Sequence, residues 1–177
     1  MMRQDIFIEK IVRRKKTIKD MFLSALIISL IPIIAFGTLL LGPELGSALG
    51  LPLIAGACYL AYRLISGMNT EFEYIATNED LTIDKIIARR KRKRLFNGSC
   101  RSFTILAPVS DRSFQTSKTD RVKLLDYSSG VDNPNRWFLV TNKDSQQVMI
   151  IFEPDDRFLE SFKRYNPRAL TQAGITT

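Results

Sequence analysis

The fold is decided by the stretch Met21–Tyr62, which reads MFLSALIISLIPIIAFGTLLLGPELGSALGLPLIAGACYLAY and carries one charge, Glu44, in 42 residues. A helix of about 20 apolar residues crosses a bilayer core about 30 Å thick. The stretch is too long for one span and long enough for two, Met21–Leu41 and Leu45–Ile65, with the turn within Gly42–Gly50. The sequence therefore predicts a two-helix transmembrane hairpin over residues 21–66.

The positive charge of the chain, +8 in total, is concentrated in two segments. Residues 1–20 hold seven Lys and Arg against three acids, and the unbroken run Arg89–Arg94 holds six more. Lys and Arg close to a span are retained on the cytoplasmic side, and the turn region Gly42–Gly50 has none. This pattern predicts a multi-pass cell-membrane protein with both termini cytoplasmic. A cleaved signal peptide is the rival interpretation, but the apolar segment is too long and no small-residue cleavage site follows it.

The first 20 residues form a basic amphipathic arm. Apolar positions 7, 8, 11, 12 and 18 have the spacing of a helix, with acids in its first turns and bases after them. We expect either a helix lying in the membrane interface or a cytoplasmic extension of the first span that packs on the soluble domain.

Small residues recur along the predicted hairpin at Gly46, Gly50, Gly56 and Ala57. Small residues let membrane helices approach closely, so these four positions are the predicted helix-packing residues, within the hairpin or against another protein. No buried ionisable side chain lies inside either span, since Arg63 stands at the end of the second span, so the sequence does not support a transport path.

Residues 67–167 have the pattern of a small β domain. Alternating apolar and polar positions predict strands, at residues 70–77, 81–86, 100–106, 121–127, 136–141 and 147–152. Residues 107–120 and 128–135 are rich in turn formers and are expected to be loops. Pro154-Asp155-Asp156 predicts the start of a helix, and Asn166-Pro167 its end. The fold class is thus a transmembrane hairpin followed by a mainly β (α+β) domain, a small antiparallel barrel or sandwich capped by a C-terminal helix, with residues 168–177 as a tail.

This order of elements resembles the pleckstrin-homology-like (PH-like) superfold, in which a seven-strand barrel is capped by a terminal helix. Three segments, Phe7–Thr17, Glu71–Arg94 and Ile151–Asp155, look like an uncharacterised family of small two-span membrane proteins of clostridial-type bacteria with a PH-like cytoplasmic domain. The resemblance implies the fold and a membrane setting, and it brings no assigned activity. The eukaryotic lipid-binding modules usually carry a tryptophan in the terminal helix, whereas Trp137 lies in a predicted strand.

Chemistry-bearing residues give no catalytic pattern. The chain has no histidine, the commonest general base and metal ligand. Cys100 therefore has no histidine partner, and Cys58 lies within a span. Asp155 and Asp156 could bind a divalent cation, but helix capping explains them better. We expect no enzyme, no cofactor and no metal.

The basic run is the one feature with a functional interpretation. Successive strand side chains point to opposite faces, so six consecutive cations cannot all face solvent from a half-buried strand, and we expect a strand end, an edge or a projecting turn. The run could be a solvated device that fixes topology, or could dock on anionic lipid headgroups of the cytoplasmic leaflet, or could bind an acidic protein. Nucleic acid is disfavoured because few aromatic residues accompany the run. The predicted contact residues are Arg89, Arg90, Lys91, Arg92, Lys93 and Arg94, supported by Arg13, Arg14, Lys15 and Lys16.

The sequence accordingly predicts a non-enzymatic, membrane-anchored binding or scaffold module that docks on the anionic leaflet or on a protein. The alternative is an accessory or regulatory subunit of a larger membrane complex, held by its transmembrane hairpin.

Overall fold

The computed structural model of the chain describes residues 6–118, 122–130, 133–143 and 146–171. These residues divide into two compact units. The helical unit comprises Lys16–Thr70 with Ile87–Arg89, and the β unit holds the other described residues.

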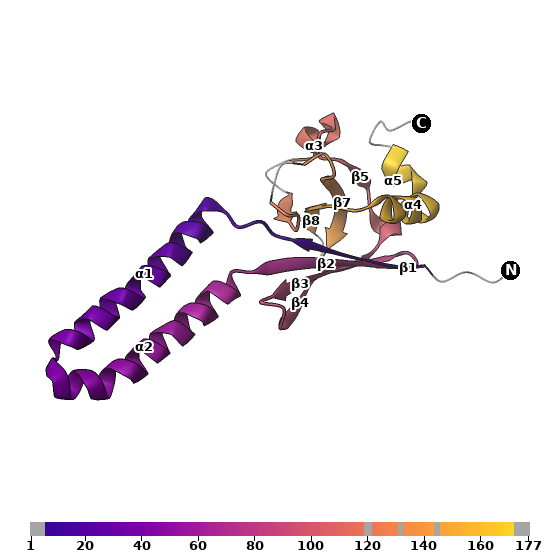
Figure 1. Cartoon of the computed structure of the whole chain (residues 1–177). Coiled ribbons are helices and arrows are strands. Elements are labelled where there is room, and N and C mark those ends of the chain that lie inside the picture. The colour runs from indigo at the N-terminus through magenta and orange to yellow at the C-terminus, as the bar shows by residue number, and fades with distance from the viewer. Residues whose placement is uncertain (1–5, 119–121, 131–132, 144–145, 172–177) are drawn as a thin grey trace. The chain divides into compact units, whose positions relative to one another are not determined.

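The helical unit contains α1, Ile18–Leu40, and α2, Gly42–Gly67, which lie antiparallel to one another (Figure 1). The chain reverses at Gly42, whose φ of +82° suits glycine, and Pro43 stands in the first turn of α2, where its missing N–H costs nothing. The expected turn over Gly42–Gly50 is therefore wrong, because Gly46 and Gly50 are already helical. Both helices are long and apolar enough to cross a membrane, and only 6% and 11% of their apolar windows are buried. A core helix of a soluble protein would be mostly buried.

Sheet A of the β unit has the strand order β1-β2-β3-β4, with β1 Phe7–Arg13, β2 Thr70–Thr77, β3 Asp80–Ile87 and β4 Lys91–Ser99. The predicted hairpin of β2 and β3 is confirmed. Its turn passes through Asn78, which has a φ of 54°.

The strand β1 corrects the helical interpretation of the N-terminal arm. It pairs antiparallel with β2 from Phe7 opposite Thr77 to Arg13 opposite Glu71. Ile8 and Val12 are buried whereas Ile11 is 51% exposed. A helix would have placed Ile8 and Ile11 on one face, whereas a strand separates them. The domain therefore takes its first strand from before the helices and its second from after them.

Sheet B has the order β5-β7-β8-β6, with β5 Ile105–Pro108, β6 Lys123–Asp126, β7 Trp137–Lys143 and β8 Gln146–Phe152. The predicted hairpin of β7 and β8 is confirmed, and the residues 144–145 between these strands lie outside the described residues. The strand β6 pairs with β8 in parallel. This pair departs from the all-antiparallel expectation.

Short helices complete the β unit. The predicted C-terminal helix is confirmed as α4, Asp156–Tyr165, capped by Asp155, whose carboxylate accepts a hydrogen bond from the backbone N–H of Phe158 at 3.2 Å. A 3-10 turn, η1, spans Cys100–Ser102 where a strand was expected. A helix, α3 (Arg112–Ser117), lies in the predicted loop, and another, α5 (Pro167–Thr171), lies in the predicted tail, of which residues 172–177 fall outside the described part.

The main core lies between sheet A, sheet B and α4. It includes Tyr74 of β2, Phe152 of β8, and Phe158 and Phe162 of α4, all at most 1% exposed. Phe114 of α3 covers a second, smaller cluster on the other face of sheet B, built around Phe138. The protein thus consists of two N-terminal apolar helices followed by a mostly β domain with a C-terminal helix.

Candidate functional site

The basic run begins in the turn after β3 and continues along β4, an edge strand of sheet A. The turn passes through Ala88 and Arg89, whose φ angles are 51° and 56°. Two consecutive residues with positive φ give the tight reversal that suits a β-hairpin. All six side chains of the run are exposed. The prediction that the run lies at a turn and an edge strand agrees with this placement.

Two members of the run form ion pairs with carboxylates of β2 and β3 in the same sheet. The Nη2 atom of Arg92 lies 2.9 Å from Oε1 of Glu73 in β2, and Nε of Arg94 lies 3.1 Å from Oδ1 of Asp84 in β3. Arg92 and Arg94 therefore point to one face of sheet A, here called the acidic face. The run is not a uniform set of free cations.

Glu73 is the most deeply placed charge of the acidic face. Its side chain is 1% exposed, and its Oε2 atom has no hydrogen-bond partner among the described residues. Burial raises the pKa of the Glu73 carboxyl, the Arg92 guanidinium acts in the opposite direction, and the carboxyls of Glu9 and Asp84 raise it further. Glu73 therefore depends on Arg92 for its charge balance.

The N-terminal basic segment, Arg13–Lys16, begins at the last residue of β1, the other edge strand of sheet A. Nε of Arg13 lies 2.7 Å from Oε1 of Glu71 across the β1–β2 pair, so this cation also serves the acidic face. The backbone N–H of Lys15 donates to the backbone carbonyl of Ser129 at 2.8 Å. The segment is therefore anchored on the β unit by its backbone.

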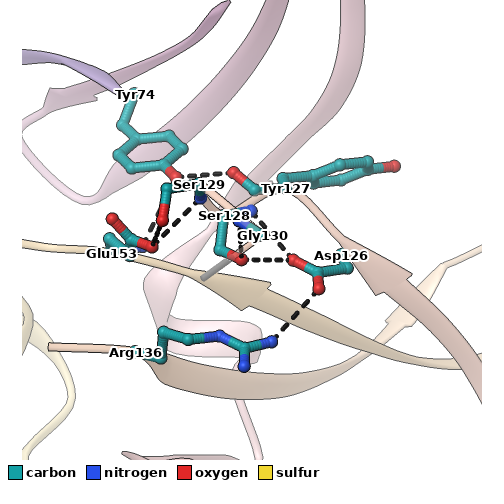
Figure 2. Close-up of polar contacts among 8 residues, drawn as sticks. All are labelled: Tyr74, Asp126, Tyr127, Ser128, Ser129, Gly130, Arg136 and Glu153. Carbon is teal, nitrogen blue, oxygen red and sulfur yellow. Dashed lines mark hydrogen bonds and ion pairs between the residues drawn. The ribbon is translucent and has the colours of Figure 1, made fainter. Parts of the chain in front are cut away.

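The anchor of Lys15 is itself held by a buried carboxylate. Oε1 of Glu153 accepts hydrogen bonds from the backbone N–H of Ser129 at 3.0 Å and from its hydroxyl at 2.6 Å (Figure 2). The Tyr74 hydroxyl donates to the carbonyl of Tyr127 at 2.6 Å, and burial raises the Tyr74 pKa, so the phenol keeps its proton. These bonds fix the segment between β6 and β7 at its start.

The carboxylate of Asp126 holds the same segment through a second set of contacts. Oδ1 of Asp126 accepts from the N–H and the hydroxyl of Ser128, at 2.9 and 2.6 Å, while Oδ2 lies 3.1 Å from Nη2 of Arg136 (Figure 2). Gly130, with a φ of +78°, donates its N–H to the Ser128 hydroxyl at 3.2 Å. These hydrogen bonds and the ion pair to Arg136 hold the start of the loop, so the cluster positions the backbone of Tyr127–Gly130. Sequence reasoning missed it, because Ser-Ser-Gly in a predicted loop gives no sign of a carboxylate 24 residues later in the chain.

Strand directions bring the two basic segments to one end of sheet A. β1 runs antiparallel to β2, and the tight turns after β2 and β3 reverse the chain twice more. The end of β1, the start of β2, the end of β3 and the start of β4 therefore lie together. The chain enters α1 from this end of the sheet and returns from α2 to it.

The described residues contain no arrangement of side chains suited to catalysis. Burial raises the pKa of the Cys100 thiol to about 11, so the thiol is protonated and a poor nucleophile at neutral pH. No group of three or more Cys, Asp or Glu side chains among the described residues could hold a metal ion. Asp155 and Asp156 cap and begin α4.

The predicted helix-packing residues divide into two pairs. A Cβ at Gly46 would lie 2.6 Å from the carbonyl oxygen of Thr38 in α1, and one at Gly50 would lie 3.4 Å from the Thr38 hydroxyl. These two glycines permit close contact of α1 and α2. Gly56 has open space around it and does not pack on α1, and the next residue, Ala57, is half-buried.

The chain is thus of a class in which two apolar helices are placed between the first and second strands of a mainly β domain that ends in a helix. The family model described as bacterial PH-like domain (DUF6106) matches residues 4–172, and the chain belongs to that family. No curated protein and no solved structure matches the chain. The expected bacterial PH-like membership is confirmed, and PH-like domains are typically binding or scaffold modules. The clostridial-type origin stays a prediction.

Proposed function

We propose that this chain is a non-enzymatic, membrane-anchored binding module whose β unit docks on the anionic lipid headgroups of the leaflet that it faces. The hairpin of α1 and α2 spans the membrane, and the basic run and Arg13–Lys16 supply the contact. The observation that carries this proposal is that both basic segments lie at the end of sheet A from which the chain passes into both helices.

The lengths of the connections support this proposal. Only Met68 and Asn69 separate α2 from β2, and residues 14–17 separate β1 from α1. An extended residue spans at most about 3.5 Å, so the start of β2 stays within roughly 10 Å of the end of α2 in any orientation of the β unit. The backbone N–H of Ala88 donates to the carbonyl of Asn69 at 2.9 Å, so the start of the basic run lies beside this linker. The Debye length at physiological salt is about 8 Å. The cations are therefore within reach of the headgroups.

The positive charge of the two basic segments favours docking on an anionic membrane surface rather than on a neutral one. Each Lys or Arg close to an anionic leaflet contributes about 1 kcal/mol. Several unpaired cations would therefore hold a tethered domain against such a surface, because the tether already removes most of the cost of bringing the two together.

The pairing of β1 with β2 also supports the topology. Strands before and after the hairpin belong to one sheet, so the two ends of the hairpin share a side. The cations that precede α1 and follow α2, and their absence from Gly42–Gly50, favour the cytoplasmic side for both termini.

The test uses the full chain, since the β unit includes β1. The chain is reconstituted into neutral vesicles and into vesicles containing an anionic phospholipid, each with a dansyl-labelled lipid. Energy transfer from Trp137, the one tryptophan of the chain, reports how close the β unit lies to the headgroups. We expect greater transfer in the anionic vesicles, lost at high salt. Equal transfer in both would overturn the proposal.

A second function is favoured by the open surface at Gly56. A small residue with no neighbour within its own hairpin is suited to contact with a helix of another protein. In this case the chain is an accessory or regulatory subunit of a larger membrane complex. Extraction in mild detergent should then recover a stoichiometric partner, and Gly56→Leu should release it. Recovery of the chain alone would exclude this function.

A further inference from the structure

We infer that the basic run contains two sets of cations with different roles, and that within the run Arg90, Lys91 and Lys93 are the residues that contact anionic lipid. Arg92 and Arg94 are internal counter-ions of sheet A. This inference rests on the proposed docking function and names the residues of the run that perform it. Arg89 is assigned to neither set.

The counter-ion set is defined by the burial of its partners. The side chains of Glu73 and Asp84 are 1% and 10% exposed, while those of Arg92 and Arg94 are about 60% exposed. If Arg92 moved to a phosphate, Glu73 would be left buried and uncompensated. Because the guanidiniums are exposed, the loss is that of a hydrogen bond to a buried carboxylate, which shifts an equilibrium by about tenfold even at the lower end of the measured range. A single cation near an anionic leaflet gains only about fivefold, so the pairs persist.

The lipid-facing set follows from strand alternation. Because Arg92 and Arg94 point to the acidic face, Lys91 and Lys93 between and before them point to the opposite face. On β1 and β2 that face carries Val12 and Phe72, which are buried in the main core, whereas Lys91 and Lys93 on the edge strand β4 are exposed.

Exposure completes the assignment. Arg90, Lys91 and Lys93 are all exposed, and the described residues provide no ion pair for any of the three. Their ammonium and guanidinium groups can therefore meet phosphate oxygens without breaking an existing contact.

The experiment compares two variants that each remove two positive charges from the same four-residue segment. Both K91Q/K93Q and R92Q/R94Q are made in the full chain, reconstituted in anionic vesicles, and followed by energy transfer from Trp137 to dansyl-labelled lipid. Unfolding of the β unit by urea is measured on the same samples. We expect K91Q/K93Q to lower the ratio of docked to undocked β unit by about 25-fold, which is fivefold for each cation, and to leave the urea midpoint unchanged.

The other variant should show the opposite pattern. R92Q/R94Q should lower the urea midpoint, because two buried carboxylates lose their partners. Adding E73Q/D84N to R92Q/R94Q removes both partners of each ion pair. This four-residue variant should recover the urea midpoint of the wild type and should dock like the wild type. If R92Q/R94Q fails to fold, the four-residue variant still tests the inference, since its docking is compared directly with K91Q/K93Q.

The outcomes separate the inference from the function on which it rests. Anionic docking that is lost in K91Q/K93Q and kept in the four-residue variant supports the inference. Equal loss in both would overturn it and leave docking by the whole run intact. A wild type that shows the same energy transfer in neutral and anionic vesicles would overturn the docking function itself.

Discussion

Shortening Ile8 to alanine should destabilise the β unit, whereas the same change at Ile11, three residues later in the same strand, should have little effect. Ile8 lies in the main core at 7% exposure, and Ile11 is 51% exposed on the acidic face of sheet A. Both substitutions remove the same three carbon atoms, so they form a matched pair.

The magnitude follows from burial. Removing three buried carbons at about 0.8 kcal/mol each gives roughly 2.4 kcal/mol, and the cavity left behind brings the loss at Ile8 to about 3 kcal/mol. The half-exposed Ile11 should lose about 1 kcal/mol at most. For a domain of this size the urea dependence of the unfolding free energy is about 1.5 kcal/mol per molar. The midpoint should therefore fall by about 2 M for Ile8→Ala and by less than about 0.7 M for Ile11→Ala.

The assay is urea unfolding of the full chain in mild detergent, followed by tryptophan fluorescence. The single tryptophan, Trp137, lies in β7 and outside both apolar helices, so its signal reports the β unit alone. Equal midpoint losses for the two variants would refute the reasoning. They would show that residues 7–13 bury Ile8 and Ile11 on one face, as an amphipathic helix does.

Three further predictions concern other parts of the molecule. Glu153→Gln replaces a charge that accepts two hydrogen bonds in the interior, so it should lower the unfolding free energy by about 1.5–3 kcal/mol in the same urea assay, and an unchanged midpoint would contradict this. Gly46→Ala places a methyl group 2.6 Å from the carbonyl oxygen of Thr38, so it should lower the melting temperature of the helical circular-dichroism signal in detergent. Gly56→Ala places its methyl group in open space and should leave that temperature unchanged. Equal melting temperatures for the two variants would contradict the contact between Gly46 and Thr38. The pKa of the Glu73 carboxyl is raised in the folded chain, so the stability that its proton contributes is present at acid pH and is lost as the pH rises above about 4.5. The urea midpoint of Glu73→Gln should therefore rise relative to that of the wild type between pH 4 and pH 7. A difference between the two midpoints that does not change with pH would contradict this linkage.

Features set by local composition were predicted from the sequence. The apolar helices follow from 42 residues with one charge, and α4 follows from Asp155 and its apolar face. The basic run was expected at a turn or an edge strand because a half-buried strand would bury every second side chain, and the cations of the run cannot be buried in this way. In each case the deciding interaction is with solvent, lipid or near neighbours in the chain.

Features set by distant contacts were not predicted. Apolar residues at positions 7, 8, 11 and 12 fit both a helix and a strand, and the choice is made by pairing with β2, whose Glu71 lies 58 residues after Arg13. Likewise Arg92 and Glu73 are 19 residues apart in sequence, so their pairing could not be seen in the run itself. The turn of the hairpin was misplaced because glycines and a proline suggest a loop, whereas Pro43 here begins a helix.

The position of β1 before the helices has a consequence for biosynthesis. During synthesis β1 leaves the ribosome first, and its partner strand is made only after both helices have been completed. Until then Ile8 and Val12 have no core to enter, and β2 alone would present an unpaired edge. In a hairpin that crosses the bilayer, the sheet can close only if both helices have inserted and the chain has returned to its starting side. For such a hairpin, closure of the sheet would act as a check on insertion, because a chain with one helix left outside the membrane would keep β1 and β2 on opposite sides and the domain would stay incomplete.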